Sequence, residues 1–319
     1  MATLSIHNIA ICGGIMKILI AEDEPNVRAL LDTVVTRLGY EVEAVSDGTE
    51  AWAVLERPNA PRFAILDWVM PGMSGPEICR KVRQRSRAPY VYIILVTGMS
   101  TVNHLVEGMD AGADDYITKP FHSEQLMARL RAGQRILDLQ QELLATQKVL
   151  EIRATHDGLT GLWNHAAILE RLAEELNRAE REMASVGVIL LDLDHFKRIN
   201  DTYGHMVGDQ VLKESARRMT LAVRSYDMVG RYGGDEFLII VPGCDGQATV
   251  QVAERVCVEV AVTPFVIPNG NLTVTVSAGA SVAIAAKKMA RGLIIEVADR
   301  ALYGAKEAGR NQVKWLIPE

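Results

Sequence analysis

Hydrophobic residues follow two alternating patterns in the first part of the chain. Short, continuously apolar runs are typical of strands that are buried on both faces of a sheet. Between the runs, apolar residues recur at helical spacing, as they do in residues 27–38. This alternation predicts a doubly wound α/β domain with a five-stranded parallel sheet and right-handed crossovers. The strands are expected at residues 17–21, 41–45, 63–66, 90–96 and 115–118.

A different pattern occupies residues 123–154. The segment has no proline and a single glycine, Gly133, so a long helix is expected. Ile136, Leu143 and Leu150 recur every seven residues, which favours a left-handed coiled coil and therefore a stalk that pairs with a second copy. The alternative is an ordinary amphipathic helix that packs on its own domain.

The second half of the chain predicts a mixed α/β domain. Charged, amphipathic stretches that predict helices alternate with apolar runs that predict strands. Gly233 and Gly234 separate two of these runs, and a glycine pair in that position indicates a tight β-hairpin. Helices are expected at residues 166–183, 208–223, 247–262 and 293–308, and strands at 186–193, 228–232, 237–241 and 272–284.

The length of 319 residues accommodates two domains of ordinary size. The predicted elements place an α/β domain at residues 16–135, and the helical segment 123–154 overlaps its end. A second domain follows at residues 155–319. Met16 stands just before the first strand, so residues 1–15 are expected to be an N-terminal extension, the alternative being a misplaced start with translation beginning at Met16.

Composition excludes several functional classes. A net charge of -6 gives no indication of nucleic-acid binding, which usually requires a basic surface. No apolar run reaches the ~18 residues of a membrane-spanning helix, and the N-terminus lacks the basic start of a signal peptide. The four cysteines form no metal-binding pattern. We therefore expect a cytoplasmic protein.

Polar residues stand at the ends of four predicted strands in the first domain. They are Glu22 with Asp23, then Asp67, Thr97 and Lys119. The carboxyl ends of strands in a doubly wound sheet converge on one crevice. Three carboxylates can hold Mg²⁺ there, a carboxylate can accept a phosphoryl group, and a lysine and a hydroxyl can bind the phosphate oxygens.

Residues Lys17–Leu137 resemble response-regulator receiver domains. The motif at Ile65–Gly75 (ILDWVMPGMSG) matches the family pattern around its phosphoacceptor, and Lys119–Phe121 (KPF) matches its lysine motif. The resemblance implies that a sensor histidine kinase phosphorylates Asp67. It also implies Mg²⁺ ligands at Glu22, Asp23 and Asp67, phosphate-sensing residues at Thr97 and Lys119, and an aromatic switch at Tyr116.

The predicted hairpin suggests a second site. Glycines lack side chains and let a bulky nucleotide approach the backbone at Gly233 and Gly234. Asp235 follows directly, and we expect it to lie beside Asp192 at the end of a neighbouring strand. Two carboxylates from neighbouring strands can bind a divalent metal for phosphoryl transfer.

Five motifs in order make residues Thr155–Leu316 resemble the GGDEF diguanylate cyclase family. They are Asp157–Asn164 (DGLTGLWN), Asp192–Asp201 (DLDHFKRIND), Gly204–Asp209 (GHMVGD), Arg231–Phe237 (RYGGDEF) and Ala298–Asn311 (ADRALYGAKEAGRN). The resemblance implies a nucleotidyl-cyclase-like fold. It further implies that two GTP molecules on two facing domains condense to cyclic di-GMP and pyrophosphate.

The same resemblance implies a role for each matching residue. Catalytic residues would be Asp192, Lys197, Asp235 and Glu236. Ligands of Mg²⁺ (or Mn²⁺) would be Asp192, Asp235, Glu236 and the carbonyl of Leu193. Residues that bind GTP would be Asn200 and Asp209 at the guanine, Gly233 and Gly234 on the hairpin, and Lys197, Lys306 and Arg310 at the triphosphate.

A third site is expected upstream of the hairpin. Arg224 and Asp227 stand at the spacing of the family's inhibitory site, and Arg255 resembles a further arginine of that site. Arginine suits product binding because its planar group grips phosphate and guanine edges. The alternative for an isolated Arg-x-x-Asp is a surface ion pair.

Together these expectations describe a phosphorylation-regulated diguanylate cyclase that works as a homodimer or a higher homo-oligomer. Phosphorylation of Asp67 would change receiver contacts, and the stalk would set the arrangement of the two cyclase domains. Three alternatives are a domain that only senses cyclic di-GMP, an adaptor whose receiver recruits partners, and a cyclase with a different base preference.

Overall fold

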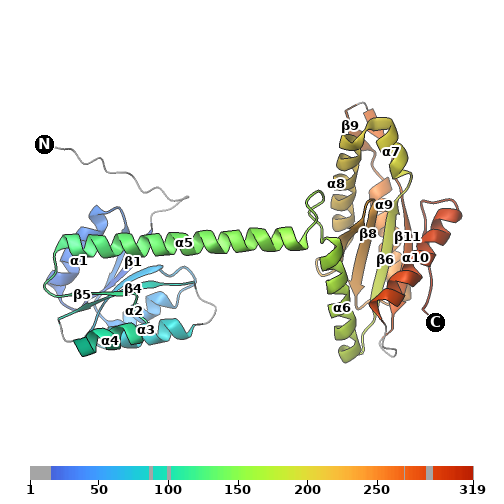
Figure 1. The fold of residues 1–319 in the computed structure, drawn as a ribbon. Helices are drawn as coiled ribbons and strands as arrows, with labels where there is room; N and C mark the ends of the chain where they lie inside the picture. The colour runs from blue at the N-terminus through green and yellow to red at the C-terminus, as the bar shows by residue number, and fades with distance from the viewer. Residues whose placement is uncertain (1–15, 86–88, 99–101, 269, 285–289, 319) are drawn as a thin grey trace. The chain divides into compact units, whose positions relative to one another are not determined.

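A computed structural model describes residues 16–85, 89–98, 102–268, 270–284 and 290–318, and the expected extension at 1–15 lies outside them. The chain divides into two compact units, the first ending at Thr146 and the second beginning at Gln147. The division falls within the long helix α5 (Ser123–Thr155). Figure 1 shows the helices and strands of both units with their labels.

The first unit contains a five-stranded sheet in the order β2-β1-β3-β4-β5, and every neighbouring pair is parallel. This order places β1 beside β3, at the point where the direction of winding reverses. The carboxyl ends of the strands at such a point form the usual ligand crevice. The strands are β1 (Lys17–Ala21), β2 (Glu41–Val45), β3 (Phe63–Asp67), β4 (Tyr92–Thr97) and β5 (Asp115–Thr118).

Helices cover both faces of this sheet. On one face, Leu31 of α1 and Leu126 of α5 pack with Phe63, and all three are fully buried. On the other face, Val54 of α2 and Ile78 of α3 pack against alternate residues of the same strands. Burial of each such side chain stabilises the fold by about 1.5–3 kcal/mol. Besides α5, the helices of this unit are α1 (Pro25–Arg37), α2 (Gly48–Leu55), α3 (Gly75–Gln84) and α4 (Val102–Asp110).

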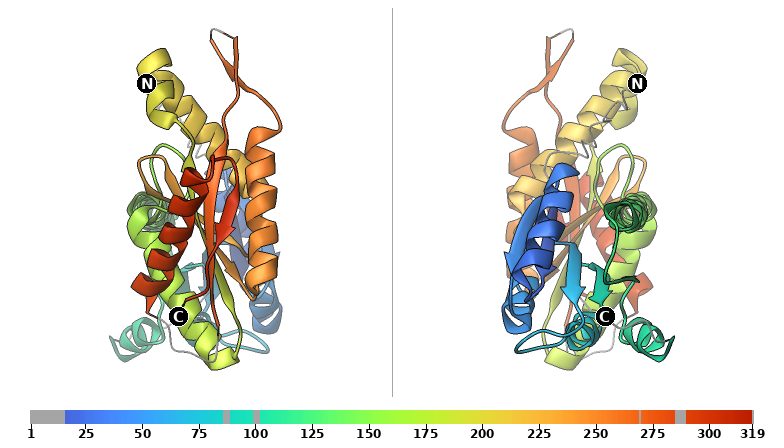
Figure 2. Two further views of the ribbon diagram at one scale, coloured as in Figure 1. Left: turned by 90° about the vertical axis from the view of Figure 1, so that its right-hand side faces the viewer. Right: turned by 90° about the vertical axis from the view of Figure 1, so that its left-hand side faces the viewer.

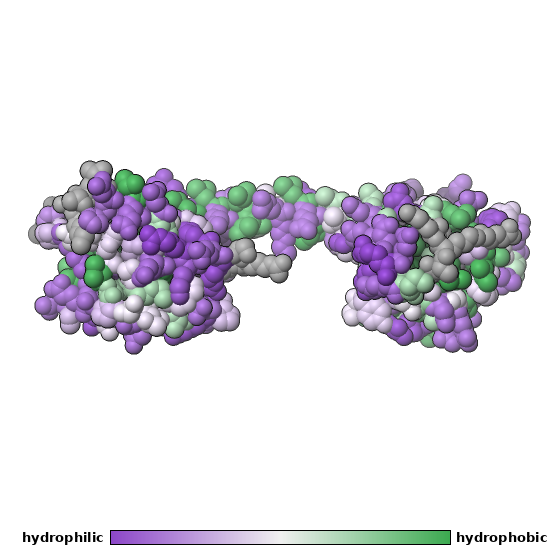
Figure 3. Space-filling model, turned by 90° about the horizontal axis from the view of Figure 1, so that it is seen from below, coloured by the Kyte–Doolittle hydropathy of each residue, from purple (hydrophilic) through white to green (hydrophobic). Residues whose placement is uncertain are grey.

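Helix α5 is continuous over 33 residues, and its apolar side chains change environment along its length. Leu130 is fully buried in the first unit, and a Cβ on Gly133 would lie 2.6 Å from the rings of Phe63 and Tyr92, so this glycine permits close packing. Further along, Leu143 is 58% exposed. Figure 3 shows hydrophobic and hydrophilic residues side by side on this helix.

The second unit has a mixed sheet in the order β12-β11-β6-β8-β7. The pairs β11–β6, β6–β8 and β8–β7 are antiparallel, and β11–β12 is parallel. A separate two-stranded sheet joins β9 to β10. The strands are β6 (Val186–Leu193), β7 (Met228–Gly233), β8 (Glu236–Pro242), β9 (Phe265–Ile267), β10 (Gly270–Leu272), β11 (Val276–Ala283) and β12 (Val313–Trp315).

Helices also cover both faces of the second sheet. Alternate strand residues pack with Met219 of α8 and Val256 of α9 on one face, and with Ile168 of α6 and Ile294 of α10 on the other. Figure 2 shows α9 in orange and α10 in red on opposite sides of the strands. The helices are α6 (His165–Glu182), α7 (Phe196–Tyr203), α8 (His205–Ala222), α9 (Gly246–Ala261) and α10 (Arg291–Glu307).

The expected fold class is confirmed for both units, but several element boundaries were wrong. Helix α7 was not predicted. It has only eight residues, and Ile199 is its one buried residue, so it gives no repeated apolar spacing. Helix α8 begins at His205, three residues before the expected start at Gly208. The expected strand 272–284 is two strands, β10 and β11, and the three-residue strands β9 and β12 were too short for a periodic signal.

Candidate functional site

The first unit brings the predicted receiver residues together at the carboxyl edge of its sheet. Glu22 follows β1, Asp67 ends β3, Thr97 ends β4, and Lys119 follows β5. Glu22, Asp67 and Thr97 are buried, whereas Asp23 is exposed. The expected aromatic switch, Tyr116 in β5, is half-buried and packs against the α2–α3 side of the core.

Lys119 holds two of the carboxylates. Its Nζ lies 2.8 Å from Glu22 Oε1 and 3.0 Å from Asp67 Oδ2. Burial raises the pKa of Glu22, the charge of Asp67 raises it further, and the hydrogen bond from Lys119 opposes both. Burial lowers the pKa of Lys119, but its bonds to the two carboxylates outweigh burial and the pKa is raised. The lysine therefore stays cationic and balances part of the acidic cluster.

The same cluster fits a divalent cation. One carboxylate oxygen each from Glu22, Asp23 and Asp67 can be chosen so that the three atoms lie within 4.8 Å of one another. Glu22 Oε2 is buried and has no hydrogen-bond partner. A buried carboxylate oxygen without a partner is costly unless a further group satisfies it. Oxygen ligands at this spacing suit Mg²⁺, which also retains water ligands.

In the second unit, β7 and β8 form the expected hairpin. Gly233 pairs with Glu236, so the two turn residues are Gly234 and Asp235 rather than the glycine pair. Gly234 has φ of 38°, a conformation that favours glycine. The backbone amide of Leu193 donates to the carbonyl of Asp235 at 3.3 Å, which ties the turn to the end of β6.

The turn places carboxylates on neighbouring strands. Asp192 is the direct partner of Glu236 across β6 and β8, and Lys306 Nζ lies 2.7 Å from Asp192 Oδ2. Burial raises the pKa of Asp192; Lys306 lowers it, and the charge of Asp235 adds to the rise. Burial also raises the pKa of Glu236, with the charge of Asp192 as the next cause. One lysine thus faces several half-buried acids.

These acids are not gathered as closely as those of the receiver. Among residues the structure describes, only the receiver cluster places three ligand atoms within 4.8 Å of one another. The lysine already occupies one oxygen of Asp192. The donor set still fits a divalent cation, because burial and the charges of neighbouring acids raise the pKa values of Asp192 and Glu236, and an added positive charge would stabilise both carboxylates.

The expected guanine-binding residues lie on adjacent helices. Asn200 is on α7, and Asp209 is half-buried on α8. A Cβ on Gly208 would lie only 1.8 Å from Asn200 Oδ1, so a glycine is required for this approach. Asn200 Oδ1 is buried and has no hydrogen-bond partner, which leaves it free to accept from a ligand.

Two expected triphosphate ligands, Lys197 and Arg310, are exposed. Lys197 lies in the first turn of α7, and Arg310 follows α10 with φ of 64°. The side chains of these two residues form no hydrogen bond or ion pair within the described part of the chain. The structure therefore joins Lys306, but not these two, to the carboxylates.

Sequence reasoning missed two contacts that hold this site. Arg231 pairs with both oxygens of Asp157 at 3.2 Å and donates to the carbonyl of Gly234 at 2.7 and 2.9 Å. Asp194 is buried and accepts a hydrogen bond from the backbone of Asn311 at 3.0 Å. All these residues were within recognised motifs, but neither spacing nor periodicity indicated which of them touch.

The residues of the expected inhibitory site lie near one another. The amide of Arg224 donates to Asp227 Oδ2 at 2.8 Å, and Asp227 Oδ1 is buried without a partner. The guanidinium of Arg224 donates to the hydroxyl of Tyr226 at 2.7 Å. Arg255 Nε donates to the carbonyl of Ala222. The charges of all three residues also act on the Cys244 thiol. Burial raises the pKa of this thiol, the charge of Asp227 raises it further, and the charges of Arg224 and Arg255 lower it.

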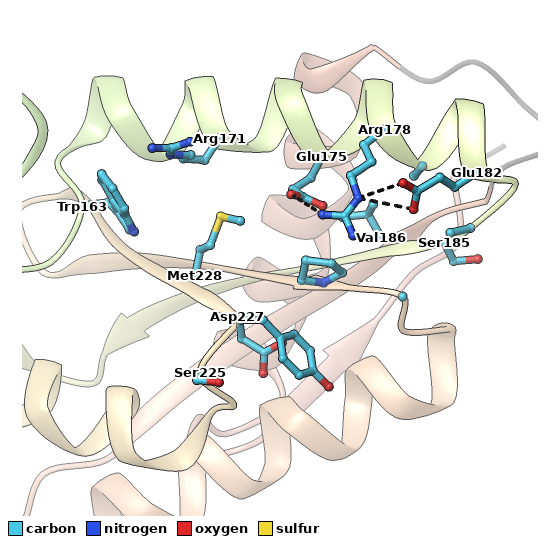
Figure 4. Close-up of a pocket in the computed structure, with 15 residues that line it drawn as sticks. Trp163, Arg171, Glu175, Arg178, Glu182, Ser185, Val186, Ser225, Asp227 and Met228 are labelled. Atoms are coloured by element: carbon cyan, nitrogen blue, oxygen red, sulfur yellow. Dashed lines mark hydrogen bonds and ion pairs between the residues drawn. The ribbon is translucent and has the colours of Figure 1, made fainter. Parts of the chain in front are cut away.

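Asp227 borders an open groove of about 550 Å³ between α6 and the start of β7. Figure 4 shows Arg171, Glu175 and Arg178 on α6, facing Asp227 and Met228 across it. Arg178 is held by Glu175 at 3.4 Å and by Glu182 at 3.2 Å. Both side chains of the Arg178–Glu182 pair are exposed, so this pair contributes little stability, whereas the side chain of Glu175 is only 13% exposed.

Within the described ranges, none of the helices is both long and apolar enough to span a membrane.

Comparison with known protein families identifies both units. Residues 18–131 match the response regulator receiver domain, and residues 154–312 match the diguanylate cyclase GGDEF domain.

Individual relatives agree. The response regulator PleD of Caulobacter vibrioides is 30% identical over 285 residues, which are 88% of this chain, and the chain spans 62% of that protein. The solved coiled-coil and GGDEF domain of DgcB from Caulobacter crescentus, in complex with c-di-GMP, is 31% identical with a TM-score of 0.54; the match covers 60% of this chain and 99% of that one. Diguanylate cyclase SiaD from Pseudomonas aeruginosa, solved with its activator SiaC, is 36% identical with a TM-score of 0.50, over 61% of this chain and 74% of that one. The chain therefore belongs to the GGDEF diguanylate cyclase family and combines that domain with a response-regulator receiver domain.

Proposed function

We propose that this protein condenses two molecules of GTP into cyclic di-GMP with release of pyrophosphate. The observation that carries the proposal is the direct pairing of Asp192 with Glu236 across β6 and β8, beside the Gly234–Asp235 turn. Half-buried carboxylates beside a glycine-containing hairpin turn suit a nucleoside triphosphate and its bound metal ion. The relatives DgcP and SiaD, which are named diguanylate cyclases, support the same activity.

In each condensation step, the 3′-hydroxyl of one GTP attacks the α-phosphorus of the other. A bond forms between them, the bond to pyrophosphate breaks, and the hydroxyl loses its proton. Glu236 would assist the loss of that proton or help to hold the metal, as its position opposite Asp192 and beside the Gly234–Asp235 turn allows. Asp192, Asp235, Glu236 and the Leu193 carbonyl would hold Mg²⁺ or Mn²⁺, which would supply charge neutralisation.

Other residues bind and orient the substrate. Asn200 and Asp209 would read the guanine edge, and the unpartnered Asn200 Oδ1 supports this role. Lys306 would exchange its bond with Asp192 for the triphosphate once the metal neutralises that carboxylate. Lys197 and Arg310, which are exposed, would complete the cationic side of the site. Catalysis would then rest on positioning and charge neutralisation.

The receiver would control this activity. A sensor histidine kinase would transfer a phosphoryl group to Asp67, with Mg²⁺ held by Glu22, Asp23 and Asp67. Lys119 already lies 3.0 Å from Asp67 and would bind an oxygen of the new phosphate. Thr97 and Tyr116 would report the change to the receiver surface. A phosphorylation event of this kind acts by shifting an existing equilibrium between states.

Assembly is the proposed control point, because each cyclase domain holds one GTP and the product needs two. Leu143 and Leu150 are 58% and 57% exposed on α5, seven residues apart. Exposed leucines at heptad spacing support pairing with a second copy of the chain. Phosphorylation would raise the fraction of homodimer or higher oligomer, and thereby activity.

Product inhibition is the last element of the proposal. Cyclic di-GMP would bind Arg224, Asp227 and Arg255. The buried, unpartnered Asp227 Oδ1 supports a ligand at this position, as does the open groove beside it.

The decisive experiment is GTP turnover with the product identified by mass spectrometry. It should be run with and without beryllofluoride, a phosphate mimic, while oligomer size is measured by light scattering. Wild type should form cyclic di-GMP, and the mimic should increase both oligomer size and rate. Asp235→Asn should form none, and Asp201→Asn on the exposed side of α7 serves as a matched control. If wild type forms no cyclic di-GMP, whatever its oligomer size, the proposal is refuted.

A further inference from the structure

Asp194 is a buried carboxylate just beyond β6, two residues after Asp192. Its side chain accepts three hydrogen bonds, from Thr275 Oγ1 and Ser277 Oγ at 2.7 Å and from the amide of Asn311 at 3.0 Å. It is only 5% exposed, and in the described part of the chain it pairs with no lysine or arginine. Because protein donors occupy both of its oxygens, Asp194 is committed to the fold rather than to a metal.

The segment that Asp194 holds has an unusual backbone. Arg310 and Asn311 have φ values of 64° and 46°, and non-glycine residues adopt the left-handed conformation rarely and at a cost in free energy. Two further hydrogen bonds fix the segment: the amide of Arg310 donates to Ala305, and the amide of Ala278 donates to the carbonyl of Gln312. Such conformations persist where the surroundings determine them, and they concentrate at functional sites.

The hydrogen bond from Asn311 to Asp194 joins this turn to the strand that carries Asp192. The buried carboxylate of Asp194 thus connects two parts of the proposed triphosphate site. Asp192 precedes Asp194 by two residues, and Arg310 precedes Asn311, which donates to Asp194. A loss of the bond would let the turn relax toward ordinary backbone angles. Arg310, which the proposed function assigns to the triphosphate, would then no longer be held in one backbone conformation.

We propose that Asp194 is a positioning residue for the substrate, which holds the Arg310–Asn311 turn so that Arg310 meets the GTP triphosphate. The inference rests on the proposed function, because it takes Arg310 as a phosphate ligand. A purely structural Asp194 would affect stability alone, whereas a positioning residue also changes the dependence of the rate on GTP concentration.

The first test measures the turn itself, by hydrogen–deuterium exchange on the full chain. Asp194→Asn keeps the shape but has one neutral acceptor oxygen in place of two charged ones, so the hydrogen bonds from Thr275, Ser277 and Asn311 cannot all persist and those that remain are weaker. Ser281→Ala is the matched control, because this buried β11 hydroxyl donates to the Leu316 carbonyl at 3.0 Å, away from the turn. Asp194→Asn should raise exchange in residues 308–312 about tenfold and Ser281→Ala should not. Equal exchange in wild type and Asp194→Asn would overturn the inference.

The second test is a double-mutant cycle with Arg310→Ala, in which KM and kcat for GTP are measured with Mg²⁺. Asp194→Asn should raise KM about tenfold with a smaller effect on kcat, and should add nothing in the Arg310→Ala background. The same increase in both backgrounds would show that Asp194 acts independently of Arg310, against the inference. Wild type that makes no cyclic di-GMP would refute the proposed function, while the exchange measurement would still decide whether Asp194 holds the turn.

Thr275→Val provides a milder variant, since it removes one donor and leaves the carboxylate in place. It should give a smaller rise in exchange at residues 308–312 and a smaller rise in KM. If exchange at residues 308–312 and KM for GTP both stay at wild-type values in folded Asp194→Asn or Thr275→Val protein, the role proposed for Asp194 is contradicted.

Discussion

Arg231 and Asp157 are 74 residues apart in sequence and form an ion pair, with Arg231 NH1 3.2 Å from each carboxylate oxygen. Asp157 lies two residues beyond the end of α5, and the other two nitrogens of Arg231 bind the carbonyl of Gly234. One arginine thus connects the end of the long helix to the turn that carries Asp235. This contact joins the segment that follows α5 to the turn that is proposed to bind GTP.

Replacement of Arg231 by lysine should lower kcat for GTP about tenfold. Lysine carries a single ammonium group and cannot bridge a carboxylate and a carbonyl with three nitrogens, so the turn would lose its support. Arg217→Lys, at an exposed α8 ion pair with Glu214, is the matched control and should leave kcat unchanged. Both proteins should unfold at nearly the wild-type temperature. An unchanged kcat in Arg231→Lys would show that the bridge is dispensable.

The ion pair should also give a pH-dependent contribution to stability. Burial raises the pKa of Asp157, but hydrogen bonds from Thr160 and the charge of Arg231 outweigh it, so the pKa lies below its ordinary value of 3.8. A lowered folded-state pKa means that the ionised carboxylate stabilises the fold above that value, and that this stability is lost as pH falls through the folded pKa.

Urea unfolding of wild type and Asp157→Asn checks this sign. Wild type should be more stable at neutral pH, and the difference in free energy of unfolding should shrink as pH falls below the ordinary aspartate pKa of 3.8 and through the lowered folded-state pKa. A difference that stays constant over that range would mean that the stabilisation does not come from the charge of Asp157.

Some of this molecule could be read from the sequence because the relevant signals are local or periodic. The buried strands β3 and β4 are continuous apolar runs, and each ends at a polar residue that the parallel topology carries to one crevice. That is why the cluster of Glu22, Asp67 and Lys119 was predicted correctly as a group.

Other features depend on tertiary contacts that leave no periodic trace. The helix α7 follows a His195 with φ of 59° and is only eight residues long, so its start carries no ordinary capping signal. The bond between Asp194 and Asn311 spans 117 residues. Asp192 and Asp194 look equivalent in sequence, and only packing shows that Asp192 pairs with Lys306 and Asp194 is buried among hydroxyls.

Gly208→Ala should weaken GTP binding. The added methyl group would lie 1.8 Å from Asn200 Oδ1, so the amide proposed to read guanine must move. We expect KM for GTP to rise about tenfold, the effect of one lost hydrogen bond to the base. Gly304→Ala in α10 is the control, since its methyl group would meet nothing within 4 Å and should stabilise the helix by about 0.5–1 kcal/mol. Equal KM values in the two variants would argue against Asn200 as a guanine ligand.

In the receiver, Glu22→Gln should weaken Mg²⁺ binding at least about tenfold, because it removes a charged ligand from a cluster of three acids. Trp68 is a convenient probe, since its amide donates to Asp67 Oδ1 at 2.7 Å and the ring is mostly buried. Its fluorescence should respond to Mg²⁺ in wild type. Glu43 lies on β2 and forms an ion pair with Arg57, so the control variant Glu43→Gln should show the same fluorescence titration with Mg²⁺ as wild type. If Glu22→Gln does so too, the metal does not bind through Glu22.

Arg224→Ala should release the enzyme from inhibition by its product. The backbone amide of residue 224 would still bind Asp227, so the turn should keep its shape, while the guanidinium that can grip a phosphate or guanine edge is lost. With GTP saturating and cyclic di-GMP added, the concentration that halves the rate should rise at least about tenfold, with little change in the uninhibited kcat. Arg217→Ala removes another exposed arginine, on α8, which is not part of the proposed inhibitory site, and should keep wild-type inhibition. Wild-type sensitivity in Arg224→Ala would leave the Arg224–Asp227 turn without a regulatory role, because a site that binds product through this arginine cannot lose it without weaker inhibition.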